Sequence, residues 1–116
     1  MAVTITRTAL SGSTNSHPIG IDAVASPGTT LHTAPTTGND ALYMIFVNRS
    51  TVTASQSQLF VEFGGTASAE LIPEPLFGQA RLELRNLMLS ASTSIVRAFA
   101  TATGRFAAVG YANRIV

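Results

Sequence analysis

The run Ala41–Val47, ALYMIFV, constrains the fold most, because seven consecutive residues are apolar or aromatic. A strand with one face in water alternates apolar and polar side chains, and this run does not. Its two faces would hold Tyr43, Ile45 and Val47 on one side, and Leu42, Met44 and Phe46 on the other. We therefore expect a central strand with one face in the core and the other under an adjacent segment or a neighbouring subunit.

The remaining sequence also predicts short strands separated by turn residues. Extended patterns occupy residues 2–10, 28–35, 56–63, 68–72, 80–85, 94–100 and 105–111. Prolines are expected to end the segment 68–72, and the last two segments are expected to form a closing hairpin across TATG. A helix over residues 79–91 competes with the strand at 80–85, because Leu84, Leu87, Met88 and Ala91 also fit helical spacing. The favoured fold is all-β, an antiparallel β-sandwich or jelly roll in a single domain.

Composition separates an N-terminal segment from this domain. From Ser11 to Asp40 the chain is rich in Ser, Thr, Gly, Pro, Asn and Ala, as in loops or in extended chain that lies on a neighbour. We expect residues 1–27 to form an extended N-terminal arm and residues 28–116 to form the sandwich.

Charge is scarce in this chain of 116 residues. Charged residues make up 11% of it, against roughly 25% in an average soluble protein. All seven basic residues are Arg, which suits interfaces better than Lys does, so we expect a surface partly covered by other protein. The Arg residues are scattered, which argues against nucleic acid as a partner. The N-terminus lacks the pattern of a secretory signal and no apolar segment approaches a membrane span, so we expect synthesis in the cytoplasm and no membrane partner.

No motif for catalysis or cofactor binding stands out. The two histidines, His17 and His32, lack the spacing of a zinc site, and we expect His32 to be a surface or packed side chain. There is no Cys and no Gly-x-Ser-x-Gly elbow, and the six acidic residues suit ion pairs with the seven Arg. We expect no enzyme activity, metal or cofactor. A glycan-binding module is an alternative, although such modules use exposed Trp or Tyr and this chain has no Trp and two Tyr.

Four sequence blocks, GTTLHTAP, IFVNRS, VEFGG and GYANRI, together resemble small β-rich virion proteins of tailed bacteriophages. The matching residues are Gly28, Thr29, Leu31, Thr33, Ala34, Pro35, Asn48, Gly110, Tyr111, Asn113 and Arg114. The resemblance spans residues 28–116, and Ser92-Thr93 replaces a Gly-Asp turn expected before the late strand.

The resemblance implies a virion structural protein, with a capsid decoration (cement) protein as the leading role and a tail, neck or baseplate component as the alternative. The implied partners are the major capsid protein or other virion proteins, and further copies of the chain, with a trimer favoured. A cement protein bridges several subunits, so weak contacts add up to lasting retention. Our candidate assembly residues are Val3, Ile5, Arg7, Leu42, Met44, Phe46, Arg81, Arg85 and Arg114.

Overall fold

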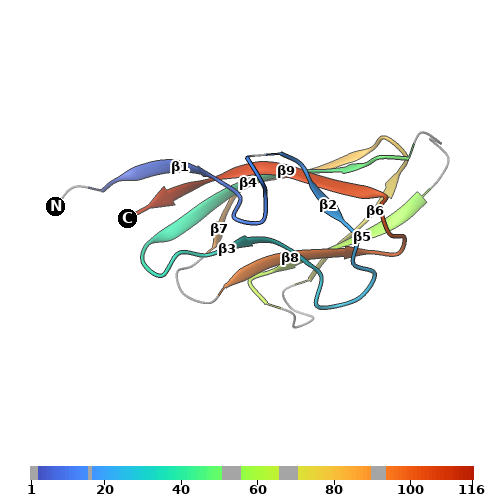
Figure 1. Ribbon diagram of the computed structural model, residues 1–116, viewed down its shortest axis with the longest axis horizontal. Coiled ribbons are helices and arrows are strands. Elements are labelled where there is room, and N and C mark those ends of the chain that lie inside the picture. Colours follow the sequence, from blue (N-terminus) through green and yellow to red (C-terminus); the bar gives the residue numbers. More distant parts are fainter. Residues whose placement is uncertain (1–2, 16, 51–55, 66–70, 90–93) are drawn as a thin grey trace.

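The computed structural model describes residues 3–15, 17–50, 56–65, 71–89 and 94–116. These residues form two antiparallel β-sheets stacked as two layers, and they contain no helix (Figure 1). The predicted all-β antiparallel architecture is confirmed. No helix in the described part of the chain is long and apolar enough to cross a membrane.

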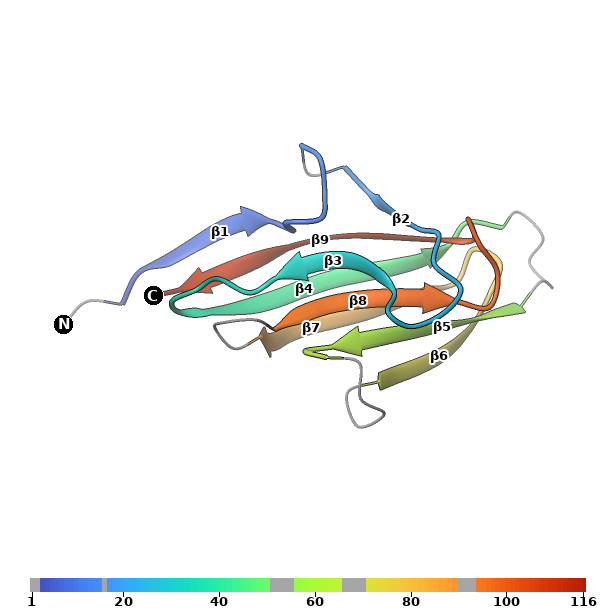
Figure 2. The same cartoon turned by 60° about the horizontal axis from the view of Figure 1, so that its bottom comes forward.

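One sheet has five strands and the other has four. The five-stranded sheet has the order β1 (Ile5–Ala9), β9 (Phe106–Ile115), β4 (Asn39–Asn48) and β7 (Arg81–Leu89), with β2 (Ile19–Ile21) also pairing with β9. The four-stranded sheet has the order β3 (Thr29–Thr33), β8 (Ile95–Ala100), β5 (Gln56–Phe63) and β6 (Leu71–Phe77). Figures 1 and 2 show both chain ends at the same end of the elongated molecule.

The strand pairs are nested around the connection between β5 and β6. Strand β5 pairs with β6, β4 with β7, β3 with β8 and β2 with β9, each antiparallel. The chain is therefore one long hairpin that rolls into two layers, and the pairs β4–β9 and β5–β8 join its turns into sheets. As a result most consecutive strands lie in different sheets.

Strand β4 has one fully buried face, as expected for the apolar run Ala41–Val47. Its inner face carries Leu42, Met44 and Phe46, all 0% exposed, which pack in the core with side chains of the other sheet such as Leu59 and Val61. Gly110 of β9 lies opposite Met44, and a Cβ there would be 2.0 Å from the carbonyl oxygen of Tyr43, so the close approach of β9 to β4 requires glycine. The outer face of β4 is half-buried, and no described strand packs over it.

Two expectations about the ends of the chain are wrong. Strands β1 and β2 are part of the sandwich, because both pair with β9, and Leu10 and Ile21 are almost fully buried in the core. The expected hairpin of residues 94–111 does not form, because β8 and β9 belong to different sheets. A four-residue turn can connect two strands of one hairpin or two strands of different sheets. The local sequence pattern is the same in both cases and therefore could not distinguish them.

Strand β6 differs in detail from the expectation, whereas strand β7 agrees with it. Strand β6 continues through Pro73 and Pro75, because an edge strand tolerates residues that lack an N–H. Residues 68–70, the first part of the strand expected at 68–72, lie outside the described residues, as does the turn at Ser92-Thr93. Strand β7 confirms the strand over residues 80–85 rather than a helix.

Candidate functional site

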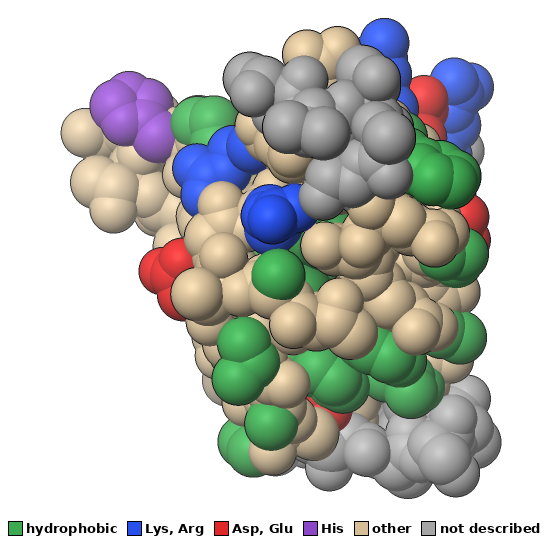
Figure 3. Space-filling view, turned by 90° about the vertical axis from the view of Figure 1, so that its right-hand side faces the viewer, with side chains coloured by type: hydrophobic (Ala, Val, Ile, Leu, Met, Phe, Trp, Pro, Cys, Tyr) green, Lys and Arg blue, Asp and Glu red, His purple; other side chains and the backbone are tan. Residues whose placement is uncertain are grey.

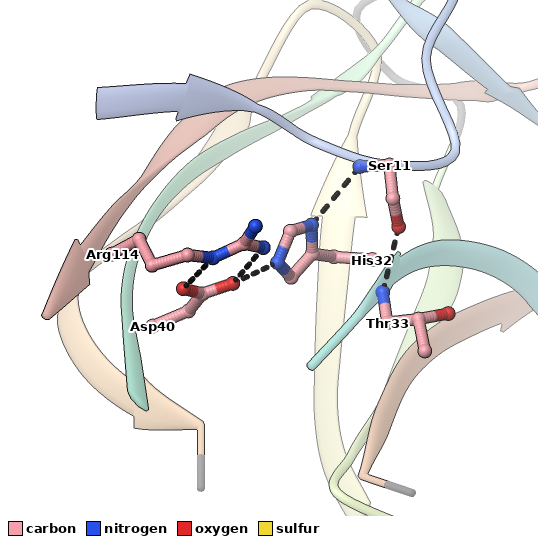
Figure 4. A network of polar contacts seen from close by, with 5 residues as sticks. All are labelled: Ser11, His32, Thr33, Asp40 and Arg114. Carbon is pink, nitrogen blue, oxygen red and sulfur yellow. Dashed lines mark hydrogen bonds and ion pairs between the residues drawn. The ribbon is translucent and has the colours of Figure 1, made fainter. Parts of the chain in front are cut away.

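A polar network crosses the interior near the end of the sandwich that holds the chain termini (Figure 4). His32 of β3 and Asp40 of β4 are 0% exposed, and their Nε2 and Oδ2 atoms lie 2.5 Å apart. Arg114 of β9 donates from Nε and Nη2 to the two Asp40 oxygens, each at 3.0 Å. The backbone N–H of Ser11 donates to Nδ1 of His32 at 3.0 Å. The network therefore joins both sheets and the segment between β1 and β2.

The contacts define the protonation of this network. Because a backbone N–H can only donate, Nδ1 of His32 must accept, so the ring is neutral and its Nε2–H donates to Asp40. Burial raises the pKa of the Asp40 carboxyl, but the hydrogen bonds from Arg114 and His32 and the positive charge of Arg114 outweigh it, so this pKa lies below its ordinary value. The result is a buried carboxylate paired bidentately with an Arg.

This cluster has the residue types of a catalytic triad without the geometry of one. The Ser11 hydroxyl does not contact His32; its Oγ accepts a hydrogen bond from the N–H of Thr33 at 2.8 Å (Figure 4). The His32 and Asp40 side chains have no exposed surface, and the described residues enclose no pocket for a substrate. Three or more potential metal ligands do not come together anywhere in the described part of the chain. The network is suited to hold segments together.

A second buried carboxylate anchors the segment before β3. Glu62 of β5 is 2% exposed; its Oε2 accepts a bond from the Ser26 hydroxyl at 2.5 Å, and its Oε1 accepts one from the N–H of Gly28 at 2.8 Å. A Cβ at Gly28 would lie 2.3 Å from the carbonyl oxygen of Ala98, so this contact also requires glycine. Glu62 thus fixes a loop onto the outer face of the four-stranded sheet.

The outer face of the five-stranded sheet carries a row of stacked side chains. The rings of Tyr43 and Tyr111 lie 5.3 Å apart and nearly parallel, and the Arg7 guanidinium lies 4.1 Å from the centre of the Tyr111 ring. The Tyr43 hydroxyl donates to Glu83, which raises the pKa of Tyr43, and Glu83 also pairs with Arg85. The ring faces of Tyr111 are therefore occupied by Tyr43 and Arg7 rather than open to a ligand.

The outer face of the four-stranded sheet repeats this arrangement with apolar side chains. The rings of Phe60 and Phe99 stack at 4.8 Å, and Phe60 lies opposite Pro73 of β6. Figure 3, which looks onto the end opposite the termini, shows hydrophobic side chains in several separate groups on the described surface. At that end the Arg49 guanidinium donates to the carbonyl oxygen of Gly104 at 2.8 Å.

The structure separates the nine candidate assembly residues into groups. Val3, Ile5 and Arg7 are exposed on or beside β1, and Arg81 and Arg85 are exposed on β7. Arg114 forms an ion pair with Asp40 within the chain, and 35% of its side chain is exposed.

The expectation that Leu42, Met44 and Phe46 meet a partner is corrected by their complete burial inside the chain. Both faces of β4 are apolar in sequence, so the alternation of side chains did not indicate which face is buried. The outward face of β4 is the opposite one, where Tyr43, Ile45 and Val47 are half-buried.

The role of Asp40 was not predicted from the sequence. Counting back by twos from Phe46 through Met44 and Leu42 reaches Asp40, so the same alternation places this carboxylate on the buried face. A buried carboxylate needs a charged or hydrogen-bond-donating partner. The position of Asp40 on the buried face of β4 therefore predicts a polar network there, but it does not identify His32 or Arg114 as the partners.

Comparisons with protein-family models, with curated proteins and with solved structures found no match to this chain.

Proposed function

We propose that this chain is a structural protein of a tailed-bacteriophage virion, with capsid decoration (cement) as its role and a jelly roll as its fold. The nested strand pairing carries the proposal. Four antiparallel pairs folded from one long hairpin into two layers match the two-sheet, eight-stranded plan of jelly rolls, a fold used in viral capsid and lectin domains. Strand β1 is then an addition to the eight.

The surface supports a role in assembly. The chain has 6223 Å² of accessible surface but only thirteen formally charged residues, and none of these is Lys. Apolar and aromatic side chains line the outer faces of both sheets, where the rings stack on one another. Such surfaces suit several small contacts at once, which is how a cement protein is retained on a shell.

The part of the N-terminal region that we propose to meet a neighbour is strand β1 of the sandwich, not an extended arm. Leu10, Ile19 and Ile21 belong to the core, so the part available to a neighbour is residues 3–9, which include β1. The proposed partners are the major capsid protein or other virion proteins, and further copies of this chain, with a trimer as the proposed unit. The proposed location is the virion, and no reaction, cofactor or nucleic acid enters the proposal.

A tail, neck or baseplate position is the alternative within the same class, and the fold supports both positions equally. The glycan-binding alternative has less support. Sugar rings stack on open aromatic faces. In this chain Tyr43 stacks on Tyr111 and Phe60 stacks on Phe99, so these rings pack against each other.

The test is where the protein is found in a culture that produces it. Particles are separated on a density gradient, and the chain is quantified by mass spectrometry against the major capsid protein. We expect the chain to migrate with full particles in many copies each and to stay with heads when heads and tails are separated. Recovery with tails would move the proposal to the alternative, and recovery only in the particle-free fraction would overturn it.

A further inference from the structure

The free edge of β1 is the unguarded sheet edge in the described structure. An edge strand presents unpaired N–H and C=O groups, and proteins protect such edges with proline, charge, bulges, short strands or covering segments. Strand β6 carries Pro73 and Pro75, and β7 carries exposed Arg81 and Arg85 and a bulge against β4. Strand β2 has three residues.

The free edge of β3 is covered by the chain itself. The N–H of Gly12 donates to the carbonyl oxygen of Leu31 at 2.9 Å, and the N–H of Thr33 donates to the Ser11 hydroxyl at 2.8 Å. Each edge other than that of β1 thus has a recognisable protection.

The register of β1 on β9 identifies the groups that are left open. Thr4 and Val116 exchange both backbone bonds, at 3.0 and 2.9 Å, so in the antiparallel alternation Thr6 and Thr8 also bond to β9. The N–H and C=O groups of Ile5, Arg7 and Ala9 therefore point away from β9, toward the edge where no described strand lies. Figures 1 and 2 both show β1 at the rim of its sheet.

Side chains do not protect this edge either. The single charge on β1, that of Arg7, is drawn onto the sheet by the Tyr111 ring and by a bond from its Nε to Asn113 at 3.3 Å. Val3, Ile5 and Val116, which are 69%, 66% and 61% exposed, lie around the same strand end. The edge thus combines free backbone groups with uncovered apolar surface.

We propose that β1 pairs antiparallel with β1 of a second copy of this chain, about a two-fold axis at Thr6. This register joins the open groups of Ile5 to those of Arg7 in the second copy and places the two Thr6 side chains side by side, a favourable cross-strand pair. A register centred on Arg7 would place two guanidinium groups opposite each other and is disfavoured. One contact then satisfies both open edges, as in isologous dimers. The inference is independent of the proposed function, because a free edge pairs copies whatever the protein does.

The test changes the edge without touching the core. Ile5→Pro removes an N–H that makes no bond within the chain, Ile5→Lys adds a charge opposite Arg7 of the second copy, and Ile5→Val is the matched control that keeps the N–H and the apolar character. The mass of each protein is measured by size exclusion with light scattering from micromolar to millimolar concentration, with circular dichroism to verify the fold.

We expect wild type and Ile5→Val to contain an even number of copies, and both Ile5→Pro and Ile5→Lys to have half that mass while remaining folded. A trimer built through another contact would thus become a hexamer in the wild type. A wild-type protein with an odd number of copies at millimolar concentration, or a mass unchanged in the folded variants, would overturn the pairing. Should Ile5→Pro fail to fold, Ile5→Lys decides. A monomeric wild type that still migrates with particles would overturn this inference alone, whereas an even-numbered oligomer absent from particles would overturn the proposed function alone.

Discussion

Replacing Asp40 by Asn should destabilise the protein far more than a surface substitution of the same kind. The amide keeps the shape of the carboxylate but carries an NH₂ group. That group faces either a donor of Arg114 or Nε2 of His32, and in the second case the ring proton must move to Nδ1, against the N–H of Ser11. Either orientation leaves two donors facing each other in the interior.

The size of the effect follows from the contacts that are lost. Hydrogen bonds to a charged group contribute about 1.5–3 kcal/mol each, and removing one partner of a buried ion pair costs about 3–5 kcal/mol. Because the Arg114 side chain is 35% exposed and can turn to water, we take the lower end of the range. We expect the free energy of unfolding to fall by about 3 kcal/mol, which for a domain of this size lowers Tm by about 10 °C.

The assay is equilibrium unfolding in urea at neutral pH, followed by far-UV circular dichroism because the chain has no Trp. The matched control is Asp22→Asn, since the Asp22 side chain is exposed and Thr103 donates to the Asp22 backbone carbonyl oxygen rather than to its carboxylate. A free energy of unfolding for Asp40→Asn within about 0.5 kcal/mol of wild type, the range of ordinary surface substitutions, would refute the reasoning.

The pH dependence gives a second readout of the same group. The pKa of Asp40 is lower in the folded protein than its ordinary value of 3.8, so the unfolded chain binds the proton more readily. The contribution of Asp40 is therefore fully present above its unfolded pKa and is lost as the pH falls through the folded pKa. We expect the stability difference between wild type and Asp40→Asn to be constant near neutral pH and to shrink below about pH 4.

Three further predictions concern the core, the strand contact and the N-terminal strand. Phe46→Asp should abolish soluble expression because Phe46 is 0% exposed, whereas Ile45→Asp on the half-buried outer face should give a folded protein by circular dichroism; equal behaviour of the two would contradict the assigned faces. Gly110→Ala should lower Tm sharply because its Cβ would meet a backbone carbonyl of β4, with Gly20→Ala, which meets nothing within 4 Å, as the harmless control. Deleting residues 1–9 should leave a cooperative thermal transition, because β1 adds no residue to the buried core; loss of that transition would show that β1 is required for folding.

The strands were largely predictable because they depend on local alternation. The run Ala41–Val47 identified β4, and the alternation from Arg81 onward identified β7 despite a competing helical pattern. Which sheet each strand joins was not predictable, since a turn such as TATG between β8 and β9 has the same residues in a hairpin and in a crossing between layers. Core residues such as Ile21 were hidden in a segment whose overall composition is that of a loop.

The polar network depends on long-range pairing, which explains why it was seen only in part. The parity of β4 places Asp40 inside, but its partners come from β3 and from the far end of the chain at Arg114. Similarly, the outer edge of β1 is open because of the register of β1 on β9, and a period-two pattern contains no information on which backbone groups face outward.

Residue-resolved amide hydrogen exchange on the concentrated wild-type protein tests the pairing of β1 most directly. The N–H groups of Thr6 and Thr8 bond to β9 within the chain, whereas those of Ile5, Arg7 and Ala9 are open unless a second copy covers them. We predict slow exchange at all five positions, and fast exchange at Arg7 and Ala9 in Ile5→Lys. Slow exchange at Thr6 and Thr8 with fast exchange at Ile5, Arg7 and Ala9 in the concentrated wild type would contradict the pairing.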